Sequence, residues 1–121
     1  MPDVQEVLEA FTRIRGVAAV VLAGTDGLVL HSVTRPDATV DVETVGAMAS
    51  HGLVPAQELG QEAGRGRLIQ SLLEFEHGLI VIEPVADAAV LAVVSDRVES
   101  LGIVRLTARR LRGELLRALT E

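Results

Sequence analysis

Residues 16–32, GVAAVVLAGTDGLVLHS, decide the fold because they hold two apolar, β-branched runs around a short turn. The runs are Val17–Ala23 and Leu28–Val33, and the turn is Gly24–Gly27. An Asp-Gly pair between two such runs supplies the positive φ angles of a tight hairpin turn. A phosphate-binding loop needs, in contrast, a lysine and a helix after its glycines. The stretch therefore predicts a β-hairpin whose glycines serve the backbone rather than a ligand.

Apolar residues have the spacing of a helix in the first and the last segment of the chain. Apolar residues over Val4–Ile14 and Leu101–Ala118 recur at three- and four-residue intervals, the spacing of amphipathic helices. Ser100, or Asp96 acting with Glu99, is expected to cap the start of the last helix. We therefore expect a terminal helix at each end, each with one buried face.

A central helix is predicted to run from Thr39 or Asp41, either of which can cap it, to about Ala63. It contains three glycines and Pro55, which removes one backbone hydrogen bond and is expected to kink the helix. Its small residues form a seam that allows a second backbone to approach closely. The seam consists of Gly46, Ala49, Gly52 or Leu53, and Ala56.

Three further apolar runs, Arg67–Phe75, Leu79–Pro84 and Ala88–Val94, are predicted strands with short turns between them. Such short connections make neighbouring strands antiparallel. Residues 17–23 and 88–94 are apolar on both faces, so the sheet should be covered on both sides. The sequence thus predicts one α+β domain over residues 1–121, in the order α-β-β-α-β-β-β-α. Its five-stranded antiparallel sheet has two helices on one face and one on the other.

The third predicted strand has apolar side chains on both faces. Alternation places Ile69, Leu73 and Phe75 on one face and Leu68 and Leu72 on the other. A single helix is thin cover for a five-stranded sheet, and an exposed apolar strand edge invites pairing. We therefore expect two copies to pair edge to edge as a homodimer.

The charge balance excludes a general nucleic-acid binder. The net charge is −6, whereas such a protein needs a basic surface, and only 2% of residues are aromatic, so stacking platforms are scarce. Basic residues gather in the last helix, which is either a solvated face or a docking face for an acidic partner. These residues are Arg105, Arg109, Arg110, Arg112 and Arg117.

No motif for catalysis, cofactors or metals is found. The chain contains no cysteine or lysine, and its three histidines do not have the spacing of metal ligands. Glu74 and Glu76 share a strand face and are expected to form a solvated edge rather than an acid–base pair. The N-terminus lacks the features of a signal peptide, and no apolar run approaches the roughly 20 residues of a membrane helix. We expect a cytoplasmic protein without membrane insertion, enzymatic activity or cofactor.

Four stretches together resemble one known family. They are IRGVAAVVLAGTDGLVLHS at 14–32, VGAMASHGL at 45–53, HGLIVIEPVADAAVLAVVSD at 77–96 and LGIVRLTARRL at 101–111. In this order and spacing the chain resembles the roadblock/dynein light chain domain family over nearly its whole length. The resemblance implies a sheet with one helix on one face and two on the other. It also implies dimers that join third strands and second helices into a continuous sheet.

The resemblance also implies a function. Members of the family regulate Ras-like GTPases or serve as adaptors, and bacterial MglB-like members are GTPase-activating partners that dock through paired second helices without donating an arginine finger. By this resemblance we expect a bacterial regulator of a Ras-like GTPase. The expected dimer and partner interface comprises Val45, Met48, Ala49, Gly52, Leu53, Ala56, Leu68, Gln70 and Leu72, of which the residues from 45 to 53 would face the GTPase.

Two other function classes are weighed against this hypothesis. A structural adaptor would use the same surfaces without changing nucleotide turnover. A small-ligand sensor is disfavoured because aromatic residues are scarce and no convergent set of polar groups is found.

Overall fold

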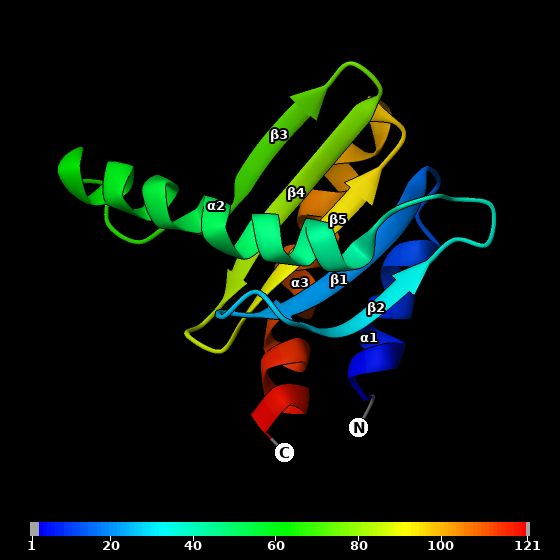
Figure 1. The fold of residues 1–121 in the computed structure, drawn as a ribbon, viewed down its shortest axis with the longest axis horizontal. Helices are drawn as coiled ribbons and strands as arrows, with labels where there is room; N and C mark the ends of the chain where they lie inside the picture. The colour runs from blue at the N-terminus through cyan, green and yellow to red at the C-terminus, as the bar shows by residue number, and fades with distance from the viewer. Residues whose placement is uncertain (1–2, 121) are drawn as a thin grey trace.

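The computed structural model describes residues 3–120 and contains three helices and five strands (Figure 1). The elements are α1 (Val4–Thr12), β1 (Val17–Gly24), β2 (Val29–Thr34), α2 (Val42–Glu62), β3 (Ser71–Phe75), β4 (Gly78–Val85), β5 (Ala89–Ser95) and α3 (Leu101–Thr120). A short 3-10 turn, η1 (Val98–Ser100), precedes α3. The predicted order of helices and strands is confirmed.

The five strands form one antiparallel sheet in the order β2-β1-β5-β4-β3. Helices α1 and α3 cover one face and α2 crosses the other (Figure 1). The predicted α+β class and the division of the helices between the faces are therefore confirmed. Strands β2 and β3 are the two edges of the sheet.

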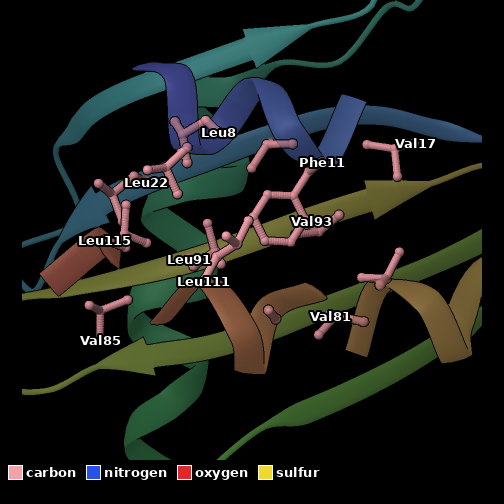
Figure 2. Close-up of a cluster of buried hydrophobic side chains, with 14 of the residues drawn as sticks. Leu8, Phe11, Val17, Leu22, Val81, Val85, Leu91, Val93, Leu111 and Leu115 are labelled. Carbon is pink, nitrogen blue, oxygen red and sulfur yellow. The ribbon is translucent and has the colours of Figure 1, made fainter. Parts of the chain in front are cut away.

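The sheet separates two cores because its central strands are buried on both faces. The larger core lies under α1 and α3, where Phe11, Leu22 and Val93 are fully buried (Figure 2). The smaller core lies under α2 and includes Val21 and Ala92. Every residue of β1 is buried, as its uninterrupted apolar sequence predicts.

The β1–β2 connection is the tight turn that the sequence predicts. The N–H of Gly27 donates to the carbonyl of Gly24 at 2.9 Å, and Gly27 has a φ of +91°. The Asp26 carboxylate accepts a hydrogen bond from the N–H of Leu28 at 3.1 Å. The turn therefore uses its polar side chain to support its own backbone.

The third strand is shorter than predicted, since pairing with β4 begins at Ser71 rather than Arg67. Because the chain is outside the sheet before Ser71, the strand alternation does not extend to Leu68. Leu68 packs against the core under α2, whereas Leu72 lies opposite Val81, a residue of the core under α3. The prediction that Leu68 and Leu72 share a face through strand alternation is therefore wrong.

The expected cap of α3 is also wrong. No side chain caps η1; the Ser100 hydroxyl lies 2.6 Å from that of Ser95, and both hydroxyls bond the carbonyl of Arg97. Asp96 instead pairs with Arg35 at 2.7 Å. The 3-10 turn before the helix uses these hydroxyls for local bonds, so they are not available for the first turn of α3.

Candidate functional site: α2 and the β3 edge

Helix α2 starts at a well-defined cap. The Asp41 carboxylate accepts hydrogen bonds from the Thr44 hydroxyl at 2.7 Å and from the Thr44 N–H at 3.2 Å, which hold the pKa of Asp41 below its ordinary value. The Ser50 hydroxyl donates to the carbonyl of Gly24 at 3.0 Å. Gly46 permits close packing on the sheet, because a Cβ there would lie 2.8 Å from a methyl group of Val29. The N-terminal half of α2 is thus fixed on the sheet.

The C-terminal half of α2 projects past the sheet (Figure 1). All buried residues of the helix lie at or before Leu53, and the helix continues through Pro55 to Glu62. Val54 and Leu59 are 56% and 70% exposed in this half. A helical segment of about two and a half turns therefore extends from the domain with apolar side chains in solvent, which is typical of an interaction surface.

One flank of α2 is open and apolar. Met48, Gly52 and Leu59 are exposed, and at 100° per residue they lie within roughly 40° of one another on the helical wheel. Apart from the adjoining residues and the backbone of α2 itself, no atom of residues 3–120 lies within 4 Å of the position that a Cβ of Gly52 would take. This open flank, defined by these three residues, allows a second backbone to approach closely.

The structure divides the interface residues expected in α2. Met48 and Gly52 are exposed, and Val45 and Ala56 are half-buried. Ala49 and Leu53 were expected on the exposed docking surface but are buried in the core beneath the helix. Those two positions are corrected: they hold α2 on its own sheet, because they lie on the same side of the helix as Gly46.

The outer edge of β3 is an unpaired strand edge in the single chain. Strand β3 pairs with β4 only, and Leu72, Leu73 and Phe75 are 42%, 42% and 52% exposed. Of the remaining expected residues, Leu68 is half-buried under α2, and Gln70 is half-buried on the side of α3. The edge strand and the projecting half of α2 therefore present two unsatisfied apolar surfaces.

The sequence prediction missed a buried ion pair between α3 and β4. Glu83 is 1% exposed and binds Arg112, whose side chain is 34% exposed. The signal was present, because Glu83 is the only charged residue in the apolar run 79–85. Arg112 thus has a structural partner, unlike the four other arginines of α3, which lie beyond 4 Å of any carboxylate in residues 3–120.

A cavity of about 270 Å³ lies where the segment before β3 departs from β4. Arg67, Asp87 and Arg112 contribute charged groups to its wall, together with the amide of Gln57. Within residues 3–120, no three His, Cys, Asp or Glu side chains are grouped so as to hold a metal ion. In the same part of the chain, no helix is both long and apolar enough to cross a bilayer.

Comparison with known families identifies the class of protein. The Roadblock/LC7 domain model matches residues 3–95, and the chain belongs to this family. Two uncharacterized proteins of Methanocaldococcus jannaschii are each 35% identical over 107 residues, covering 88% of this chain and 91% of theirs. A third protein of this archaeon is 36% identical, covering 88% of both chains. A bacterial source therefore stays a prediction.

Solved structures share the fold. The gliding protein MglB of Thermus thermophilus aligns with a TM-score of 0.84 at 24% identity, covering 95% of this chain and 87% of that one. Myxococcus xanthus MglB aligns with a TM-score of 0.82 at 20% identity, covering 94% and 92%. A Roadblock/LC7 domain of Streptomyces avermitilis gives 0.74 at 21% identity, covering 95% and 99%.

Proposed function

We propose that the chain is a cytoplasmic, homodimeric and non-catalytic regulator of a Ras-like small GTPase that docks through paired α2 helices. The observation that carries this proposal is the projecting half of α2, with apolar side chains exposed beyond the sheet. Membership of the Roadblock/LC7 family and the likeness to MglB support it. A solved structure described as MglB with tetrameric arrangement supports self-association as well.

The homodimer explains the two unsatisfied surfaces together. If two β3 edges pair, the unpaired backbone groups of each edge are satisfied and the sheets become continuous. The open flank of α2 then meets its copy, where Gly52 allows the backbones to approach closely. Leu59, in the projecting half of each helix, gains the partner as cover.

The regulator would act without chemistry of its own. Helix α2 contains no arginine or lysine, so the proposed docking surface has no arginine finger to insert into a GTPase site. Regulation would then work by holding catalytic groups of the GTPase in an active or inactive arrangement. The surface left for the GTPase after pairing includes Val54, which lies well away from the open flank on the helical wheel.

Variants at two positions separate dimerisation from GTPase docking. Gly52→Arg fills the open flank at a position where an added Cβ meets nothing beyond the backbone of α2 and the adjoining residues, so it should give a folded monomer that binds no GTPase. Val54→Asp should leave the dimer intact and abolish binding to the GTPase, measured by calorimetry against each Ras-like GTPase of the same genome. Gly113→Arg is the matched control, because Gly113 is exposed on α3 and only a flexible arginine end lies near it.

The outcomes decide between function classes. A Gly52→Arg protein that dimerises like the wild type would contradict pairing through α2. GTPase binding without any change in hydrolysis would favour the structural adaptor. Complete absence of binding by the wild-type dimer would contradict the proposal.

A further inference from the structure

The β3 edge has a charged group on the same face as α3. Leu72 and Glu74 lie opposite Val81 and Leu79, and both of these partners belong to the core under α1 and α3. Residues opposite each other in an antiparallel pair point to the same face of the sheet. The carboxylate of Glu74 therefore lies on the face covered by α3, at the exposed edge of the sheet.

A cationic group of α3, Arg105, approaches this edge and lacks an anionic partner within residues 3–120. Arg105 Nε donates to Gln70 Oε1 at 3.0 Å, which brings its guanidinium to the start of β3. Neither Arg105, Arg109 nor Glu74 forms an ion pair in the same part of the chain. Opposite charges are thus present at one edge without pairing within the protomer.

Symmetry restricts which residues can meet in a pair of β3 strands. A two-fold axis perpendicular to the sheet keeps every side chain on its own face, so residues opposite each other differ by an even number. In the one register that pairs all of Ser71–Phe75, Leu73 lies opposite its own copy. Leu72 then lies opposite the partner's Glu74, which brings that carboxylate to the start of β3, where Arg105 donates to Gln70.

We propose that the partner's Glu74 forms an ion pair with Arg105 across the β3–β3 junction; this inference rests on the homodimer of the proposed function. Two copies of the pair form in each dimer. The opposite face of the junction holds Leu73 and Phe75, which are apolar. The apolar face drives association, and the ionic face fixes the register and selects a second copy of this chain as the partner.

Charge reversal tests the proposal in sedimentation equilibrium experiments on the full chain. Glu74→Arg places two cations together at both junctions of its homodimer, and Arg105→Glu places two carboxylates together. Each variant alone should have a dimer dissociation constant at least about tenfold higher than that of the wild type. In an equal mixture both junctions of the heterodimer carry opposite charges, so affinity should return to about the wild-type value. Arg110→Glu, on another side of α3, is the control for net charge and should leave the affinity unchanged.

Two results would overturn the proposal. If the wild type dimerises and either reversal leaves the affinity unchanged, or the mixture shows no recovery, the ion pair is wrong while the homodimer stands. If the wild type remains monomeric at concentrations well above micromolar, the homodimer of the proposed function fails as well.

Discussion

The Glu83–Arg112 pair yields an asymmetric prediction for stability. Glu83 is 1% exposed and lies in β4 opposite Leu91, inside the larger core, whereas a third of the Arg112 side chain is exposed. Arg112→Met keeps the aliphatic stem but leaves the carboxylate buried without its cation. Loss of one partner of a buried pair costs about 3–5 kcal/mol, and we expect about 3 kcal/mol because this pair is partly open to solvent.

Removal of the other partner, Glu83, should lower the free energy of unfolding much less. In Glu83→Leu the guanidinium can turn toward solvent and an apolar side chain replaces the carboxylate, so we expect a loss of about 1 kcal/mol or less. The double variant Glu83→Leu/Arg112→Met should lie within about 1 kcal/mol of the wild type.

Urea unfolding, followed by circular dichroism, measures the free energy of unfolding of the wild type, the two single variants and the double variant. The protein concentration must be the same throughout, because dimerisation contributes to the apparent stability. A loss below about 1 kcal/mol for Arg112→Met, or a larger loss for Glu83→Leu than for Arg112→Met, would refute this reasoning.

Three further predictions concern backbone geometry and the loss of stability at low pH. Gly78→Ala should destabilise the protein by about 3 kcal/mol or more, since the added Cβ would overlap the carbonyl oxygen of Ser95. Gly102→Ala should be neutral or stabilise by up to about 1 kcal/mol, because its Cβ would meet no atom of residues 3–120 beyond the adjoining residues and its own helix backbone. Equal thermal shifts for the two variants would contradict this prediction. Ala86→Gly should stabilise by about 0.5–1 kcal/mol, because Ala86 has a φ of +51°; a lower melting temperature would argue against backbone strain at this turn. The pKa of Asp41 is lowered in the folded state, so its contribution to stability is present above its ordinary value of 3.8 and is lost as the pH falls through the lowered value. Asp41→Asn should therefore lose less stability than the wild type as the pH falls below 3.8. An unchanged pH dependence of stability would contradict this role of the Asp41 carboxylate.

The order of elements could be predicted from the sequence because local signals agree with tertiary packing. The Asp-Gly turn between two apolar runs and the periodicity of both terminal helices each specify one structure. The start of β3 could not be predicted, because Leu68 and Ile69 continue the apolar run of the strand although the chain is outside the sheet there. Strand pairing depends on the neighbouring strand, which local pattern does not contain.

The candidate site was predicted only in part. A seam of small residues indicates close approach of another backbone but does not say which one. In α2, Gly46, Ala49 and Leu53 pack on the chain's own sheet, and Met48 and Gly52 remain exposed. The exposure of residues 54–62 depends on the width of the sheet beneath α2, and this width is a property of the whole fold.

GTP hydrolysis tests the central claim most directly. Each Ras-like GTPase of the same genome is loaded with GTP and followed in a single turnover with increasing amounts of the wild-type protein. The account predicts that at least one GTPase changes its hydrolysis rate, that the change saturates with the protein, and that Gly52→Arg abolishes it. No binding and no change in rate with any of these GTPases would contradict the account.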